Sequence, residues 1–133
     1  MTHTQRILAA GVTGLLIAAC GGSSTTPSNV PPPGTTPPVA TNTVTITSAG
    51  VSPRNIEIAL GTRVRFINND NRSHNMTSDP HPAHDTCPDL NQVGFLAPGE
   101  SRETGNLVIA RTCGFHDHDN PSQGLLTGQI VTK

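Results

Sequence analysis

Short runs in which apolar and polar residues alternate recur between positions 44 and 131 of this chain. Three examples are Val44-Thr45-Ile46, Ile56-Glu57-Ile58 and Val64-Arg65-Phe66, and a further apolar pair, Ile130-Val131, lies near the end. Each run is bounded by Gly, Pro, Asn or Ser, and no segment repeats apolar residues at helical spacing for long enough to predict a helix. Because successive side chains of a strand point to opposite faces, the pattern predicts an all-β sandwich or barrel with alternate residues in a core.

The first twenty residues have the pattern of an export signal. Arg6 precedes an apolar run, from Ile7 to Ala19, that is too short to span a bilayer and ends in small residues before Cys20. The arrangement resembles the bacterial lipoprotein signal, which implies a signal peptide over residues 1–19 and lipidation of Cys20. An ordinary signal peptide with an incidental cysteine is the alternative. We therefore predict a lipid-anchored protein of the cell envelope, on its periplasmic or outer-surface face; Gly21 favours the outer membrane by resemblance to other lipoproteins.

Small and polar residues dominate the next segment. From Gly21 to Asn42 the only apolar side chains are Val30, Val39 and Ala40. Such a composition cannot bury enough surface to offset the entropy lost on ordering. We predict that residues 20–42 are a disordered tether and that residues 43–133 form one domain of about ninety residues, with a single modest core.

The charge balance gives no support to a nucleic-acid partner. Eight Lys and Arg stand against nine Asp and Glu, for a formal net charge of −1 at pH 7. Aspartates do occur near histidines in the second half of the chain, but no nucleophile, oxyanion-hole motif or phosphate-binding loop accompanies them. The sequence therefore predicts a protein that is not an enzyme.

Histidine and cysteine gather in two windows of the domain. Thr112-Cys113-Gly114-Phe115-His116-Asp117-His118 lies near the end, and His74-Asn75 lies well upstream, followed by His81 and His84. A thiol and imidazoles from two distant segments suit a soft, imidazole-binding metal such as copper. We predict a copper or other transition-metal site here, with a solvated histidine cluster as the alternative. His81 and His84, taken individually, are expected to be surface side chains.

The order of these landmarks resembles the cupredoxins, the plastocyanin and azurin family of copper proteins. Ile56-x-Ile58-x-x-Gly61-x-x-Val64-x-Phe66-x-Asn68-x-Asp70-x-x-x-His74 is similar to the strands that lead to the family's first histidine ligand. Leu96-x-Pro98-Gly99-Glu100-Ser101 looks like the turn before its later strands, and Cys113-x-x-His116 and Gly128-x-Ile130-Val131 resemble its ligand loop and last strand. The resemblance covers the whole domain and implies a cupredoxin-like Greek-key β-sandwich with copper near one end.

The resemblance also implies a ligand set. Copper would be held by His74, by Cys113 and by either His116 or His118, which lie at the plastocyanin and the azurin spacing from the cysteine respectively. Asn75 matches the asparagine that in the family follows the first histidine and hydrogen-bonds the cysteine sulfur, a contact that stiffens the site.

Two features depart from the family pattern. Leu126 stands where the family has its weak axial methionine, and an apolar side chain cannot donate a lone pair, so the reduction potential should rise. The ligand loop is also longer, since residues 119–123 look inserted. Met76 lies on the same strand face as His74, where core packing is favoured over a role as a substitute axial ligand.

Cys87 leaves the state of Cys113 open. With Cys20 lipidated, two cysteines remain in the exported chain, and such a pair in an oxidising compartment most simply forms a disulfide. The bridge would stabilise the domain by roughly 3 to 4 kcal/mol and would remove the thiolate that blue copper requires. Copper on a preformed thiolate would instead leave Cys87 buried and inert. The disulfide is slightly favoured.

These alternatives predict different functions. With a Cys113 thiolate, the protein is a copper-binding one-electron carrier that exchanges electrons with a redox partner in the envelope. With a disulfide, it is a non-blue copper-binding module that buffers copper or delivers it to a copper-trafficking partner. That module would use a histidine-only copper or zinc site built from His74, His116 and His118, with His81 or His84. A metal-free sandwich used for adhesion or as a scaffold is a third reading.

Overall fold

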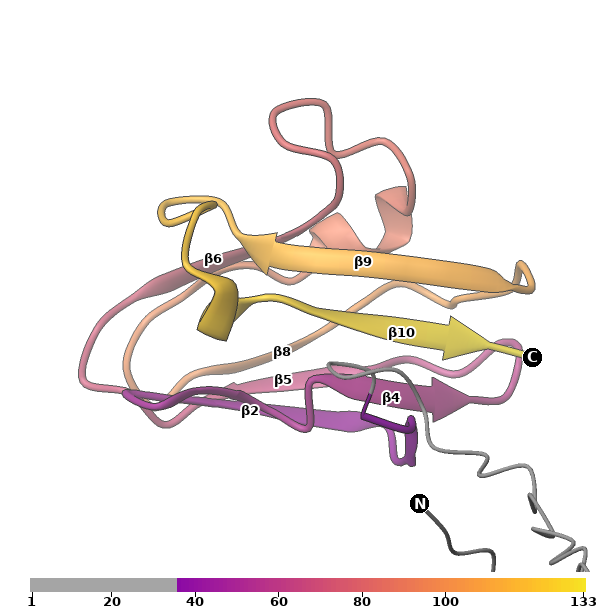
Figure 1. The fold of residues 1–133 in the computed structure, drawn as a ribbon, viewed down its shortest axis with the longest axis horizontal. Helices are drawn as coiled ribbons and strands as arrows, with labels where there is room; N and C mark the ends of the chain where they lie inside the picture. Colours follow the sequence, from indigo (N-terminus) through magenta and orange to yellow (C-terminus); the bar gives the residue numbers. More distant parts are fainter. Residues whose placement is uncertain (1–35) are drawn as a thin grey trace, which may run out of the picture. The chain divides into compact units, whose positions relative to one another are not determined.

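Two β-sheets make up the computed structural model, which describes residues 36–133 (Figure 1). One sheet has six strands in the order β1-β4-β10-β9-β6-β7, and the other has four in the order β3-β2-β5-β8. Within residues 36–133 there is no α-helix, and no helix that is long and apolar enough to cross a membrane. The predicted all-β sandwich is confirmed. The strands are β1 (Val39–Ala40), β2 (Thr43–Thr47), β3 (Gly50–Ser52), β4 (Asn55–Ile58), β5 (Arg65–Asn68), β6 (His74–Ser78), β7 (Gly94–Leu96), β8 (Ser101–Glu103), β9 (Arg111–Asp117) and β10 (Gly128–Thr132), with short 3-10 turns η1 (Pro88–Gln92) and η2 (Gly124–Leu126).

The core lies between the two sheets and is built from the alternating runs. Phe66 of β5 and Phe115 of β9 meet there edge to face, with ring centroids 5.2 Å apart, so they join one sheet to the other. Burying each large apolar side chain contributes about 1.5 to 3 kcal/mol, which makes this layer the main source of stability. Other buried members from the runs are Val44, Ile46, Ile56, Ile58, Val64 and Ile130.

Strand β9 lies between β10 and β6, and its register determines what the candidate site contains. It pairs antiparallel with both neighbours, so that His116 is opposite Thr77 and Asp117 is opposite Met76. Paired residues of neighbouring strands point to the same face of a sheet. His116 and Thr77 therefore share one face, and Asp117 and Met76 share the other.

Strand β1 lies inside the segment predicted to be a disordered tether. Val39 and Ala40 pair in parallel with β4, and this adds backbone hydrogen bonds at what would otherwise be an open sheet edge. The folded part therefore begins before Thr43, because edge pairing can order residues that bury little side-chain surface. The predicted signal peptide, Cys20 and the first part of the tether lie outside the described residues.

Residues 79–87 leave the sandwich and cross the outer face of the six-stranded sheet, at the top of Figure 1. Strand β6 continues to Ser78 before the loop begins, and the short turn η1 follows the loop. The N–H of Asp79 donates to the carbonyl of Gly114 in β9 at 3.0 Å. The loop is thus attached to the sheet it covers.

Candidate metal centre

Strand β9 carries two of the predicted ligands, and its alternation separates them. Cys113 and Phe115 point toward the four-stranded sheet, whereas His116 points to the outer face. The sequence motif predicts a ligand loop here, but Arg111–Asp117 is one continuous strand that is paired on both sides. Residues three positions apart in a strand face opposite sides of the sheet, so Cys113 and His116 cannot bind one ion while the strand is intact.

His118 continues the pairing of β9 with β6 just beyond the strand end. Its N–H donates to the carbonyl of Asn75 at 2.7 Å. Two positions after His116, its side chain returns to the same outer face. The sheet therefore supplies two imidazoles, His116 and His118, side by side.

His84 reaches the same place from the loop and is held there firmly. Its ring Nδ1 lies 2.8 Å from the carbonyl oxygen of Ser78. Its own carbonyl accepts hydrogen bonds from the Ser78 hydroxyl at 2.9 Å and from the Asn91 amide at 2.7 Å. The backbone has a φ of +52°, in the left-handed region that few residues other than glycine adopt, and these bonds stabilise it there. Backbone and ring are both oriented before any ligand arrives.

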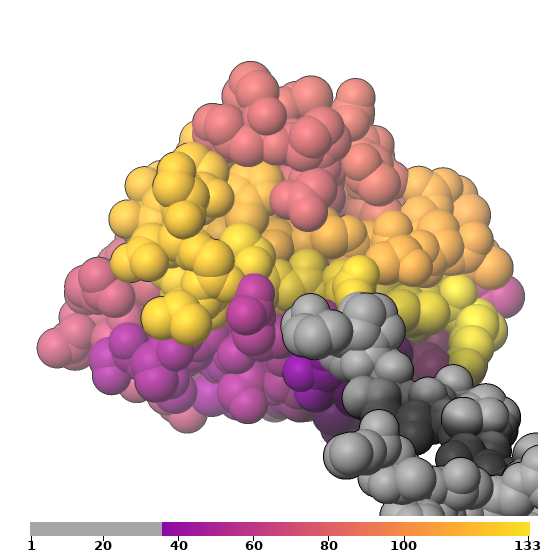
Figure 2. Space-filling model, viewed as in Figure 1, coloured from indigo at the N-terminus to yellow at the C-terminus, as the bar shows by residue number. Residues whose placement is uncertain are grey.

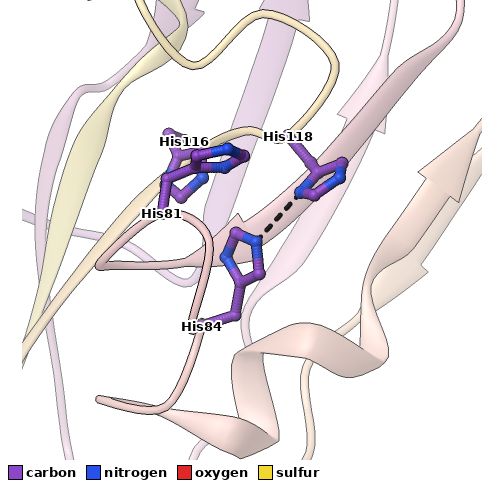
Figure 3. A group of neighbouring side chains, drawn as sticks. All are labelled: His81, His84, His116 and His118. Carbon is purple, nitrogen blue, oxygen red and sulfur yellow. Dashed lines mark hydrogen bonds between the residues drawn. The ribbon is translucent and has the colours of Figure 1, made fainter.

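Four imidazoles meet above the sheet: His81 and His84 from the loop, and His116 and His118 from the end of β9 (Figure 3). One nitrogen of each ring lies within 4.8 Å of the nitrogens of the other three. His116 is buried under the loop, His84 and His118 are half-buried, and His81 is exposed. Figure 2 shows the loop as a raised cap on this side of the molecule. We call this group the four-histidine cluster; it opens to solvent on the side of His81.

The hydrogen bonds leave ring nitrogens free to bind a metal. His84 donates through Nδ1 to Ser78, and His116 places Nδ1 at 2.6 Å from the Asp79 carboxylate. When these rings are neutral, each therefore carries its lone pair on Nε2. Nε2 of His116 lies 3.5 Å from the Thr77 hydroxyl, which is too long for a strong hydrogen bond. In His84, Nε2 lies 2.9 Å from Nδ1 of His118, a contact that an ion shared by both rings would replace.

The electrostatics of the cluster favour the neutral form of His81. Loss of solvent around the ring and the neighbouring imidazoles of His118, His84 and His116 hold the pKa of His81 below its usual 6.5. Positive charges in so small a space repel one another, so protonating one ring opposes protonating the next. Neutral imidazole is the form that binds metals.

Comparison with solved structures identifies the fold. The purple cupredoxin from Nitrosopumilus maritimus is 19% identical to this chain, with a TM-score of 0.53 over 70% of this chain and 100% of its own. The oxidised plastocyanin from Dryopteris crassirhizoma is 20% identical, with a TM-score of 0.54 over 68% and 99%. The Cu(I) form of an amicyanin variant is 18% identical, with a TM-score of 0.51 over 71% and 86%. The domain has the cupredoxin fold.

The predicted cupredoxin-like architecture is therefore confirmed, although no family model and no curated protein matches the sequence. At these identities the likeness is one of fold, and the site must be judged from its own residues.

The cupredoxin resemblance implied that His74 is the first ligand, but the structure places it away from the four-histidine cluster. His74 lies on the inner face, where its Nδ1 is 3.0 Å from Asp117 and its Nε2 is 3.1 Å from Asp70. Ring and carboxylates are almost completely buried. Both nitrogens already have carboxylate partners, so the structure does not bring His74 into the four-histidine cluster.

The hydrogen bonds around His74 favour the ionised form of both carboxylates. Burial by itself would raise the pKa of Asp117, but hydrogen bonds from His74, Asn75, Asn120 and Asp119 outweigh it and lower that pKa. The pKa of Asp70 is likewise lowered, against the effect of burial, by its bonds to the Asn71 N–H, His74 and Arg72. Both nitrogens of His74 lie within hydrogen-bond distance of these carboxylate oxygens, so both are already occupied. We call Arg72, Asp70, His74 and Asp117 the inner ion network.

Cys113 forms a disulfide with Cys87, at a Cα–Cα distance of 5.8 Å. The predicted disulfide is confirmed, and the predicted Cys113 thiolate ligand is wrong in this state of the protein. A disulfide sulfur carries no charge and is buried here in the core.

Three further predicted positions have structural rather than ligand contacts. Leu126 is buried in η2 and packs in the core. Met76 is fully buried, as core packing predicts. Asn75 contributes its backbone, which donates to Asp117 and accepts from His118, and so supports the outer site instead of a sulfur.

The sequence gives His81 and His84 only a minor place in the site. Taken individually, each is expected to be a surface side chain, and the histidine-only alternative includes just one of them. Their separation of three residues, next to a His-x-His pair elsewhere, is the only sequence signal of a shared site.

Proposed function

We propose that this domain is a histidine-only copper-binding module that buffers copper or delivers it to a partner. The observation that carries the proposal is the four-histidine cluster, in which the nitrogens of four rings lie within 4.8 Å of one another. Structural neighbours with this fold include a Cu(I) form of an amicyanin variant, which supports copper as the metal.

The dimensions of the cluster fit one ion. Four nitrogens bound tetrahedrally at about 2.0 Å from a metal lie about 3.3 Å from one another. The pair formed by His84 and His118 is already at 2.9 Å, and the largest separation is within 4.8 Å. Binding one ion therefore requires only small movements of the rings.

The donor set favours copper over other divalent metals. Imidazole suits zinc, copper and nickel, and the affinity of a nitrogen site for divalent first-row metals reaches its maximum at Cu(II). Zinc is the main competitor, because it accepts the same ligands in tetrahedral geometry.

The electron carrier predicted from the sequence rests on a thiolate that the disulfide removes. We therefore place buffering or delivery first and blue-copper electron transfer second. The disulfide supports our further proposal of an oxidising compartment such as the cell envelope. There the partner would be a redox or copper-trafficking protein, and the lipidated Cys20 would hold the chain at a membrane.

Titration of residues 36–133 with Cu(II), followed by electron paramagnetic resonance and visible absorption, tests the proposal. We expect one tightly bound ion with nitrogen hyperfine structure, a weak visible band, and binding that weakens as pH falls through the histidine range, because ligating imidazole must be neutral. The variant His84→Ala, His118→Ala should lose this binding, whereas the variant Cys87→Ala, Cys113→Ala should keep it. An intense red absorption band that requires Cys113 would restore the electron-carrier hypothesis. Absence of binding at micromolar copper would reject the proposal.

A further inference from the structure

The start of the loop places one carboxylate against the cluster. Asp79 follows β6, its N–H donates to the carbonyl of Gly114, and its carbonyl accepts from the N–H of Thr86 at 3.2 Å. Both backbone polar groups of Asp79 are therefore hydrogen-bonded, and they fix the position of its Cα above the outer face of β9. Among residues 36–133, Asp79 supplies the one carboxylate that bonds to a ring of the cluster.

The contact between Asp79 and His116 is short and asymmetric. Oδ1 lies 2.6 Å from Nδ1, and the imidazole side chain is 4% exposed while the carboxylate is 51% exposed. An acceptor at this distance holds the proton on Nδ1, so the lone pair of the neutral ring lies on Nε2. A carboxylate bonded in this way also makes the imidazole a stronger donor to a metal.

Gly114 provides the space that the carboxylate occupies. It lies on the same outer face as His116, two positions earlier in β9. A Cβ at this position would overlap Oδ2 of Asp79. Because that oxygen is the end of a half-exposed side chain, an alanine would displace the carboxylate without forcing the strand apart.

We infer that Asp79, admitted by Gly114, is a positioning residue that makes the cluster select divalent over monovalent copper; the inference rests on the proposed function. Four neutral imidazoles contribute no charge, so the carboxylate bonded to His116 supplies a compensating negative charge at the cluster. Its attraction to a bound ion is proportional to the charge of that ion and is twice as large for Cu(II) as for Cu(I). The bond to Nδ1 favours both ions equally, whereas the charge favours the dication.

Two substitutions at one position separate these effects. Asp79→Asn keeps an oxygen acceptor for Nδ1 and removes the charge, so Cu(II) affinity should fall more than Cu(I) affinity. Asp79→Ala removes both, so Cu(II) affinity should fall about 10- to 100-fold, and Cu(I) affinity should fall by less. Gly114→Ala should displace the carboxylate from Nδ1 without removing its charge, so Cu(II) affinity should fall in the same direction as in Asp79→Ala but by less. The matched control is Asp85→Asn, since Asp85 is an exposed carboxylate of the same loop that makes no bond to the cluster.

The experiment measures both affinities by chelator competition and, separately, the tautomer of His116 in the metal-free protein by 15N NMR. In the wild type we expect the proton on Nδ1, and in Asp79→Ala a mixture of tautomers. A ratio of Cu(II) to Cu(I) affinity that is the same in both Asp79 variants as in the wild type, with the tautomer unchanged, would overturn the inference and leave the copper site standing. Failure of the wild type to bind copper would reject the proposed function, and the NMR measurement would still decide the role of Asp79.

Discussion

The two faces of the six-stranded sheet use histidine in opposite ways. On the inner face, both nitrogens of His74 lie within hydrogen-bond distance of buried carboxylates, and the ring completes the inner ion network. On the outer face, His81, His84, His116 and His118 approach one another, and the protein bonds to Nδ1 of His84 and His116 leave Nε2 of each ring free. The comparison teaches that a histidine is available to a metal only when the protein leaves one of its nitrogens without an acceptor. Its place in a sequence motif does not decide this.

The largest expected effect is a loss of stability caused by a substitution on the inner face of the six-stranded sheet. Replacing His74 by Leu leaves two buried carboxylates without their shared partner, which costs about 3 to 5 kcal/mol of unfolding free energy. Urea denaturation measures the loss, and copper titration of the folded protein should show an unchanged affinity. If copper affinity falls while stability is retained, then His74 is a ligand and the distinction between the faces fails.

Removing the disulfide should lower the unfolding free energy almost as much as replacing His74, and it should leave copper binding unchanged. Its two cysteines are 26 residues apart, and the variant Cys87→Ala, Cys113→Ala should lose about 3 to 4 kcal/mol, because the unfolded chain regains freedom. The copper spectrum of the folded variant should match that of the wild type. A changed spectrum would show that Cys113 reaches the cluster after all.

Removing one histidine of the outer face should lower copper affinity and change stability little, which is the opposite of the result expected for His74. In His84→Ala we expect Cu(II) affinity to fall about 100-fold, equivalent to about 2.7 kcal/mol, because one of four donors is lost. The unfolding free energy without metal should change by only about 1 kcal/mol, since the ring is half-buried and lies outside the core. Calorimetric titration and urea denaturation on the same sample measure both quantities. Equal losses in both would indicate that the cluster is mainly structural.

Lowering the pH should abolish copper binding on the outer face before it destabilises the inner face, without any substitution. Copper binding should weaken as pH falls through the histidine range, because imidazole must be neutral to bind a metal. The folded pKa values of Asp70 and Asp117 lie below the ordinary 3.8, so their contribution to stability is present above pH 3.8 and is lost as pH falls through those lower values. Between these limits the domain should be folded and free of copper, which circular dichroism and paramagnetic resonance can follow together. Simultaneous loss of copper and fold would contradict this independence.

Much of the fold could be predicted from local pattern. The runs around Ile46, Ile58 and Phe66 are strands with these residues in the core, because the period of two is a property of the extended backbone itself. Local composition places Val39 in the tether, but the structure pairs it with β4. That pairing depends on a sheet edge distant in the sequence, which local composition does not reveal.

The candidate site was only partly predictable. The two windows rich in histidine and cysteine do meet, as their composition suggested, but Cys113 and His74 face the core while His116 and His118 face outward. The cupredoxin resemblance assigns a ligand loop to this region, but strand β9 continues through it. Successive side chains of the strand therefore point to opposite faces of the sheet, and Cys113 and His116 have different neighbours.

The sequence by itself therefore determined the strands, their inner faces and the kinds of side chain available for metal binding, because these depend on neighbours along the chain. Only the tertiary structure decided which of those side chains meet. His84 and His118 are 34 residues apart, and Cys87 and Cys113 are 26 residues apart. Their contacts depend on the register of β9 against β6 and on how the loop folds back over the sheet. In a sheet, a shift of one residue exchanges the two faces, so this register decides which side chains reach the candidate metal site.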